Sequence, residues 1–395
     1  MERVLFVVNA DEFGGLEIVL LDWLSGIDYS KTSVVLCYRS DVLLRKLALA
    51  SLPIETIKLT IPDAEPAWKT LPKWRRVFSS IRPQRIVLLE GNIGDLGMIP
   101  VLAARLSTRG GVFLFAGGGG PLPSAPMSTE KRKAQFGLFA GVGLYQFRET
   151  LKQELRSRLL RRSFVSGQGL KSNLVAHLRY PADGTSVLYH GVDTKRFQPS
   201  LADRIEYRRA NAIPDDATVI VSHGRLARVK RVDRILNAFA VLSAEHPNLW
   251  LVLTSYGPLK EEIEKTVSNN ETYRRVRLVS FQEDAAKLLK AGDIYVLASD
   301  REGFGIALIE AMSTGLVCVA TNCQGPAEII VNGENGILVS ATDEELLAGL
   351  RRALRLSQGE RAPLVERARK TVEDRFEIHA AIRNALGSLG IPSRS

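Results

Sequence analysis

The chain alternates apolar strand-like runs with helix-like stretches, and it does so twice. In the first half, strands are predicted at 4–8, 33–36, 54–58, 85–89 and 112–115, with helices near 16–27, 41–49, 72–81 and 95–106. In the second half, strands are predicted at 217–222, 249–254, 276–280, 293–297 and 316–320, with helices near 231–245, 258–268, 283–291 and 306–314. Such alternation is typical of parallel sheets covered on both faces, which bind ligands at the carboxyl ends of their strands.

A polar, basic and proline-bounded stretch near 182–215 separates the two alternating halves. We place an N-terminal domain at 1–182 and a C-terminal domain at 183–375, because 395 residues suit two cores better than one. The chain is predicted to be largely helical from about 341 to 388. A last helix within 376–395 can pack back on the N-terminal domain, which the sequence alone leaves open.

Composition narrows the class of protein. No apolar run approaches the ~20 residues of a membrane span, and the first residues lack a signal-peptide layout, so we expect a cytoplasmic protein. The three cysteines form no CxxC pair, as expected in a reducing compartment. The net charge of +10 favours an anionic partner. A nucleotide and a membrane surface stay open, whereas nucleic acid is disfavoured because no recognisable nucleic-acid-binding motif occurs.

Two carboxylates bracket a glycine turn at the end of a predicted strand. Glu302 precedes Gly303 and Gly305, a helix is expected to begin near Gly305, and Glu310 follows about two turns later. The free N–H groups of a helix start favour a phosphate. Carboxylates repel phosphate, so they are better suited to accept hydrogen bonds from hydroxyls. The turn therefore predicts a ligand that carries both phosphate and sugar.

Two cations, Arg225 and Lys230, follow the strand predicted at 217–222 and could clamp a diphosphate. Alone, such a pair is more often an ordinary basic surface. A second glycine turn, Gly14-Gly15, enters the first helix, although glycine pairs commonly serve only to turn the chain.

Together these motifs resemble the retaining GT-B glycosyltransferases of family 4, group 1. The resemblance is carried by Gly224-Arg225-Leu226 with Lys230 and Asp233, Tyr256-Gly257-Pro258, Glu302-Gly303-Phe304-Gly305 with Glu310-Ala311-Met312, Gly325 to Glu328, and Asn332 to Gly336. It is strong across 185–340 and weaker before, where Gly14 to Glu17, Ser166 and His190 to Asp193 carry it. It implies two facing Rossmann-like domains with a cleft between them.

The resemblance also implies roles for individual residues. Arg225 and Lys230 would stabilise the departing diphosphate, and Glu302 would lie near hydroxyls of the donor sugar. The residues implied in donor binding are Gly15, Gly224, Tyr256, Gly257, Phe281, Gly303, Phe304, Gly305, Ile306 and Glu310, the last accepting from the ribose. The implied enzyme is a hexosyltransferase that uses a nucleotide-diphosphate sugar and a saccharide or lipid-linked acceptor in cell-surface polysaccharide or glycolipid synthesis. No cofactor is expected, and no metal, because the chain lacks Asp-x-Asp, HExxH and a cysteine/histidine cluster.

Two alternatives stay open, and one departure from the family pattern supports the second of them. Many relatives carry a histidine in the N-terminal domain, whereas the earliest histidine here is His177. Glu90, Asn92 or the loop from Gly117 is expected to take its place. The alternatives are a nucleotide-sugar 2-epimerase and a non-catalytic nucleotide-sugar-binding protein.

Two basic segments bear on a peripheral membrane contact. In 148–162, Leu151, Leu155, Leu159 and Leu160 fall on one side of a helix rich in arginine. This fits an ordinary packed helix with a solvated basic face, and it also fits docking on anionic lipid. The two tryptophans of 68–76 lie among lysines and arginines, which fits the same contact or a core covered by long basic side chains.

Overall fold

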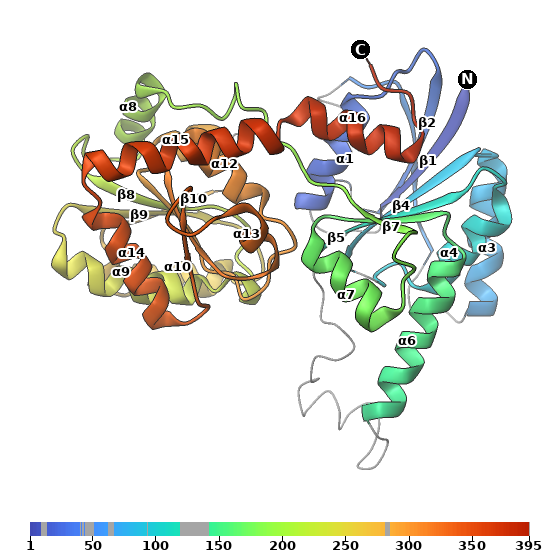
Figure 1. Cartoon of the computed structure of the whole chain (residues 1–395), viewed down its shortest axis with the longest axis horizontal. Helices are drawn as coiled ribbons and strands as arrows, with labels where there is room; N and C mark the ends of the chain where they lie inside the picture. The colour runs from blue at the N-terminus through green and yellow to red at the C-terminus, as the bar shows by residue number, and fades with distance from the viewer. Residues whose placement is uncertain are drawn as a thin grey trace. The chain divides into compact units, whose positions relative to one another are not determined.

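A computed structural model describes residues 1–8, 14–39, 41, 43, 51–61, 67–92, 94–118, 142–280 and 285–394. These residues form two compact units, each built on one parallel sheet (Figure 1). Unit 1 comprises Met1–Tyr189 and Ala381–Ser395, and unit 2 comprises His190–Ala380. The prediction of two parallel α/β domains is confirmed.

Unit 1 contains the strand order β3-β2-β1-β4-β5-β6-β7 in its described part. The strands are β1 (Glu2–Val8), β2 (Thr32–Tyr38), β3 (Ile54–Lys58), β4 (Arg85–Asn92), β5 (Val112–Gly118), β6 (Arg162–Val165) and β7 (Thr185–Val187). The helices are α1 (Gly15–Ser25), α3 (Ala67–Ile81), α4 (Met98–Ser107), α6 (Val142–Arg158) and α7 (Gln168–Leu178). Neighbouring residues of one strand point to opposite faces, so β5 shows which helices cover each side. Leu114 joins the core under α3, α4 and α7, whereas the ring of Phe115 meets Trp23 of α1 at 5.0 Å.

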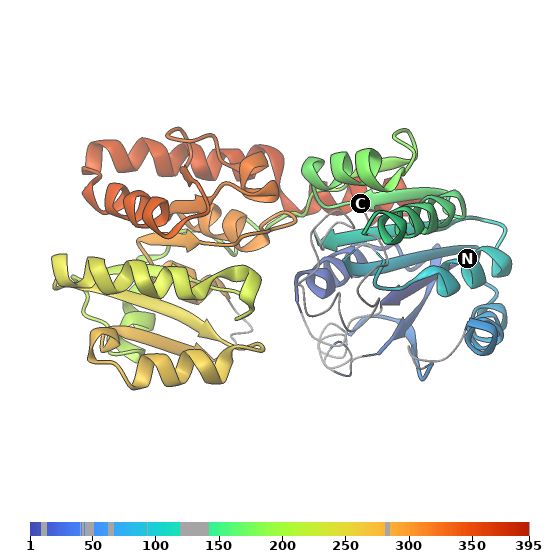
Figure 2. The same ribbon diagram turned by 90° about the horizontal axis from the view of Figure 1, so that it is seen from below.

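The helices on the first of these faces form a row. α4 contacts both α3 and α6, and α6 and α7 lie side by side in both views (Figures 1 and 2).

Unit 2 contains the strand order β10-β9-β8-β11-β12-β13 in its described part. The strands are β8 (Thr218–Ser222), β9 (Leu249–Ser255), β10 (Val276–Ser280), β11 (Ile294–Leu297), β12 (Val317–Thr321) and β13 (Ile337–Val339). The helices are α8 (Leu201–Ala210), α9 (Val232–Glu245), α10 (Lys260–Ser268), α11 (Ala285–Lys290), α12 (Ile306–Thr314), α13 (Gln324–Ile329), α14 (Asp343–Arg355) and α15 (Gln358–Arg375). The last helix, α16 (Ile378–Leu389), begins at the end of unit 2 and belongs mostly to unit 1. α9, α10 and α14 bury Phe239, Ile263 and Leu350 in one core with the sheet. β8 and β11 are neighbours although far apart in sequence, and this neighbourhood positions the candidate site.

Several elements differ from their predicted bounds. α3 begins at Ala67, before the predicted start at 72, so Pro72 lies inside the helix and not at its start. The helix predicted at 41–49 falls almost wholly outside the described residues. The helical stretch after 341 is divided into α14, α15 and α16. Across the described chain, no helix has both the length and the apolar character needed to cross a membrane.

Candidate functional site

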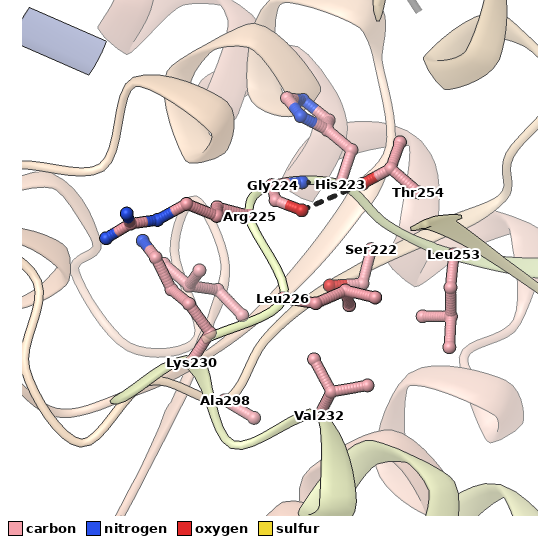
Figure 3. Close-up of a pocket in the computed structure, with 11 residues that line it drawn as sticks. Ser222, His223, Gly224, Arg225, Leu226, Lys230, Val232, Leu253, Thr254 and Ala298 are labelled. Atoms are coloured by element: carbon pink, nitrogen blue, oxygen red, sulfur yellow. Dashed lines mark hydrogen bonds between the residues drawn. The ribbon is translucent and has the colours of Figure 1, made fainter. Parts of the chain in front are cut away.

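A pocket opens at the carboxyl ends of β8 and β11 in unit 2 (Figure 3). Its lining consists of Ser222, His223, Gly224, Arg225, Leu226, Lys230, Val232, Leu253, Thr254, Leu297 and Ala298. In Figure 3 the side chains of Arg225 and Lys230 extend to the same side of the loop that carries both. The two predicted cations are therefore brought together at a sheet edge of the kind that binds ligands in α/β folds.

Glycines shape the loop that presents Arg225. Gly224 has φ +143°, and the hydroxyl of Thr254 accepts from its N–H and donates to its carbonyl, both at 2.9 Å. Gly257 has φ +114°, and a Cβ there would lie 2.7 Å from Cγ of Arg225. The N–H of Leu226 donates to the carbonyl of Tyr256 at 2.7 Å. The predicted Gly224, Tyr256 and Gly257 thus hold the loops after β8 and β9 together through the backbone.

Lys230 forms an ion pair with Glu302, in which Nζ donates to Oε2. Lys230 ends a short 3-10 helix, Arg228–Lys230, and Glu302 follows β11. A backbone hydrogen bond of 2.9 Å from the N–H of Asp300 to the carbonyl of Val229 joins these two segments. Both side chains keep part of their surface in solvent, 30% for Lys230 and 17% for Glu302. The pair is thus accessible to a polar ligand.

Two guanidinium groups stabilise the contact between the turn that carries Lys230 and the loop that carries Glu302. Arg234 donates to the carbonyl of Ala298 at 2.9 Å and to the carboxylate of Asp300 at 3.2 Å. Arg231 donates to Asp233 at 2.8 Å, and this hydrogen bond is the main cause of its raised pKa. These contacts keep the turn that carries Lys230 against the loop that carries Glu302.

Glu310 lies on α12 beside His223. Nε2 of His223 is 3.1 Å from Oε2 of Glu310, but the orientation of the two groups does not make a hydrogen bond. The backbone carbonyl of His223 accepts from the hydroxyl of Tyr295 at 3.4 Å, and burial raises the pKa of that phenol far above its usual value. We gave His223 no role from the sequence, although it directly precedes Gly224-Arg225 and this position could have pointed to it.

The loop between Glu302 and α12 is tightly constrained. Gly305 caps α12 with φ +111°, which leaves the amides of the first turn directed outward. A Cβ on Gly325 would lie 2.0 Å from the carbonyl oxygen of Phe304, and the N–H of Gly325 donates to the carbonyl of Glu302 at 3.0 Å. The ring of Phe304 is buried against Phe376 at 5.3 Å. Phe304 can therefore offer a ligand its backbone but not its ring.

The segment that contains these residues matches a known family. Residues 203–371 match the sequence model described as glycosyl transferases group 1. This segment, which lies within unit 2, is similar to group 1 glycosyl transferases. Arg225, Lys230, Glu302 and Glu310 all lie within it.

Individual relatives match about half of their own length. The amylovoran biosynthesis glycosyltransferase AmsK of Erwinia amylovora is 30% identical over 213 residues, which are 51% of this chain and 50% of AmsK. The lipopolysaccharide core biosynthesis glycosyltransferase LpsE of Rhizobium meliloti is 29% identical over 167 residues, 42% of this chain and 48% of LpsE. Among solved structures, Anabaena HepE in complex with UDP and glucose superimposes with a TM-score of 0.79 at 19% identity, covering 99% of this chain and 100% of that one. This likeness shows a GT-B fold.

The remaining predicted residues are divided between the two units. Gly15 begins α1 in unit 1, where the preceding amide of Gly14 already donates to Glu17 at 2.7 Å. Gly303 belongs to the loop described above, Ile306 is the first residue of α12, and Phe281 falls outside the described residues. Asn335 of the family-like Asn332–Gly336 segment is buried, and its amide bonds the backbone of Ile329 and Val331. That motif shapes a turn.

The expectation that Glu90 could take the place of the absent histidine is corrected by the structure. Glu90 is fully buried, and its carboxylate accepts two hydrogen bonds from Arg156, at 2.6 and 3.0 Å, and further ones from the amides of Gly94 and Leu96. Both oxygens of that carboxylate thus accept hydrogen bonds from groups in the core and do not face a ligand. Asn92 bonds Asp95, and Gly117 and Gly118 end β5, while 119 and 120 are outside the described residues.

Within the described ranges, no cluster of three or more histidine, cysteine, aspartate or glutamate side chains is arranged to hold a metal ion.

Proposed function

We propose that this chain is a retaining, metal-independent glycosyltransferase that moves a hexose from a nucleotide-diphosphate sugar to a saccharide or lipid-linked acceptor. The observation that carries the proposal is the arrangement at the ends of β8 and β11. There Arg225 and Lys230 line one pocket, Glu302 pairs with Lys230, and Glu310 lies beside His223 of the same loop. Cations suit the diphosphate, and carboxylates suit hydroxyls on either side of it.

Bond cleavage would place negative charge on the departing nucleoside diphosphate. The guanidinium of Arg225 can contact two phosphate oxygens at once, and the ammonium of Lys230 acts as a point charge. Preorganised cations lower the barrier most when they meet charge that develops in the transition state. The outward amides at the start of α12 add to the same field. Together they can stabilise the leaving diphosphate as a divalent cation does in metal-dependent glycosyl transfer.

The carboxylates would orient the donor. Glu302 is balanced by Lys230, so it can accept from a sugar hydroxyl without opposing the phosphate beside it. Glu310, in the middle of α12, would accept from the ribose. Because the Anabaena relative was solved with UDP, a UDP-sugar is the first donor to test. The polysaccharide and lipopolysaccharide names of the relatives favour a surface-glycan acceptor. The net charge of +10 suits the anionic cytoplasmic leaflet, where we place the protein as a peripheral enzyme.

The test is an incubation of purified protein with UDP-, GDP- and ADP-sugars in the presence of EDTA. Free nucleotide and the sugar product are followed, and the anomeric configuration of the product is read by NMR. We expect nucleotide release and a product that keeps the donor configuration. Epimerisation at C2, or tight binding with no turnover in any donor and acceptor combination, would contradict the proposal.

A further inference from the structure

Helix α6 of unit 1 buries polar side chains and exposes apolar ones, which is the reverse of an ordinary packed helix. From Phe147 onward, where its side chains are described, the buried ones are polar: Gln153, Arg156 and Ser157 are 6%, 0% and 4% exposed. Its exposed side chains include Phe147, Leu151 and Leu155, with 57%, 42% and 50% of their surface in solvent. These three lie at i, i+4 and i+8, so they form one continuous stripe along the helix. Soluble helices usually place such a stripe against the core.

Buried hydrogen bonds fix this orientation. Arg156 donates to both oxygens of Glu90 and lies 3.3 Å from the hydroxyl of Tyr180, which in turn donates to Gln153 at 3.2 Å. Rotation of α6 to bury the leucines would break this network and expose a charge pair that has been removed from water. The apolar stripe therefore faces outward as a built feature of the fold.

Basic side chains surround the stripe. Exposed Arg148 and Lys152 lie on the same side of α6, and the following residues add more positive charge. From 147 to 162, leaving out the buried Arg156, the basic residues are Arg148, Lys152, Arg158, Arg161 and Arg162, against Glu149 and Glu154. An anionic lipid bilayer has negatively charged headgroups over an apolar interior. Apolar side chains surrounded by basic ones are complementary to such a surface.

A second exposed aromatic belongs to the same row of helices. Trp68 of α3 is 72% exposed, and the ammonium of Lys69 lies 5.1 Å from the centre of its ring. Trp74, on a different side of the same helix, is buried in the core. Tryptophan prefers the boundary between lipid and water, where its ring and its N–H find different surroundings.

We propose that the stripe of Phe147, Leu151 and Leu155, with its basic flanks, docks the protein on an anionic lipid bilayer. The inference deepens the membrane part of the proposed function, because it names the surface that makes the contact. A second copy of the chain is a weaker fit. Three side chains on one helix are far fewer than the roughly 20 residues per partner in a stable protein interface.

The test is co-sedimentation of the full chain with vesicles of equal parts phosphatidylglycerol and phosphatidylcholine, and with phosphatidylcholine alone, without any nucleotide sugar. We expect binding to the anionic vesicles and little to the neutral ones. Leu151→Gln with Leu155→Gln should weaken partitioning by at least about tenfold. The matched control is Val241→Gln with Val331→Gln, two valines of unit 2 that are 43% and 52% exposed, which should leave binding unchanged.

Charge is tested separately. Lys152→Glu should weaken binding to anionic vesicles about tenfold, whereas Lys370→Glu, on α15 and also paired within its helix, should not. Absence of binding by the natural chain, equal loss in the control variants, or a leucine-dependent dimer in sedimentation equilibrium would overturn the proposal. Because no donor is present, these outcomes leave the glycosyltransferase proposal untouched, and failure of transfer leaves the docking result standing.

Discussion

Arg225 and Lys230 occupy one pocket but differ in surroundings, and this difference shapes what their loss should do. Arg225 is exposed, whereas Lys230 is paired with Glu302. Removing either cation takes away charge that would meet the departing diphosphate. We expect Arg225→Ala and Lys230→Ala each to lower kcat about 100- to 1,000-fold with the fold retained, measured by nucleotide release and circular dichroism.

The matched control for these variants is Arg228→Ala, which removes an exposed cation from the same turn without touching the pocket lining. Its kcat should change less than about threefold. Unchanged rates in both pocket variants, or an equal loss in the control, would count against the site.

The pKa of the Cys323 thiol depends on the charge of nearby Glu302, so its rate of alkylation can test the surroundings of that carboxylate. Burial, and then the nearby Glu302 carboxylate, raises the pKa of its thiol to about 11. A raised thiol pKa means that the reactive thiolate is scarce below it, about one molecule in a thousand at pH 8. Alkylation by iodoacetamide, followed by mass spectrometry, should therefore be slow at pH 8 and rise about tenfold per pH unit towards pH 11.

Glu302→Gln provides the comparison for Cys323. Loss of the carboxylate charge should lower the thiol pKa, so that labelling at a given pH becomes faster. Labelling of the natural protein at pH 8 as fast as that of free cysteine would show that this thiol is not in the surroundings described here.

At this scale the sequence predicted residue types better than their partners. Arg225, Lys230 and Glu302 could be selected because they follow strands, and Glu310 because it lies on the helix that begins after Glu302. The pairing of Lys230 with Glu302 could not be predicted, because it depends on β8 lying next to β11, which are not consecutive in the chain. The contact of His223 with Glu310 was missed for the same reason.

Helix α6 shows what periodicity leaves undetermined at the scale of an element. Leucines at helical spacing predict one apolar side formed by Leu151, Leu155, Leu159 and Leu160, but this prediction holds only for the first two. Helix α6 ends at Arg158, and Leu159 and Leu160 pack, partly buried, against the core of unit 1. Helical spacing does not say whether an apolar side faces the core, and here the buried Glu90–Arg156 pair decides that Leu151 and Leu155 face outward. A long-range polar contact between β4 and α6 has no local signature in the sequence.

The same pair predicts a large effect on stability. Arg156→Met would leave the Glu90 carboxylate buried without its cation, which should cost about 3–5 kcal/mol. Combining it with Glu90→Gln should recover part of that loss, because no uncompensated charge remains. The free energy of unfolding can be followed in urea by tryptophan fluorescence, since Trp23, Trp68 and Trp74 lie in unit 1 and only Trp250 in unit 2.

A surface arginine serves as the control for Arg156. Arg351 pairs with Glu245 while 31% exposed, so Arg351→Met should cost no more than about 1 kcal/mol. A loss at Arg156 as small as that at Arg351, or a double variant as unstable as Arg156→Met alone, would be inconsistent with a buried ion pair.

At the scale of the whole molecule, the two ends of the chain belong to one unit. The C-terminal residues Ala381–Ser395 group with unit 1, and Figure 1 shows α16 beside α1. The side chain of Ile382 lies against Gly26, where a Cβ would be only 2.2 Å from it. The amide of Asp28 donates to the carbonyl of Pro392 at 3.0 Å, and Arg394 donates to the carbonyl of Gly26 at 2.8 Å. The sequence predicted a terminal helix but left its packing open, because these contacts join residues more than 350 positions apart.

This arrangement predicts that a substitution near the C-terminus destabilises the N-terminal unit. Leu386 is completely buried, and Leu386→Ala should cost about 2–5 kcal/mol through the cavity that it leaves. Hydrogen–deuterium exchange read by mass spectrometry can locate the loss. Exchange should accelerate in peptides from β1, β2 and α1, while peptides from β8 and β9 keep their protection. Arg383→Ala, on the exposed side of the same helix, should leave both sets unchanged. Faster exchange confined to unit 2, or shared equally by both units, would mean that the last helix does not stabilise unit 1 in particular.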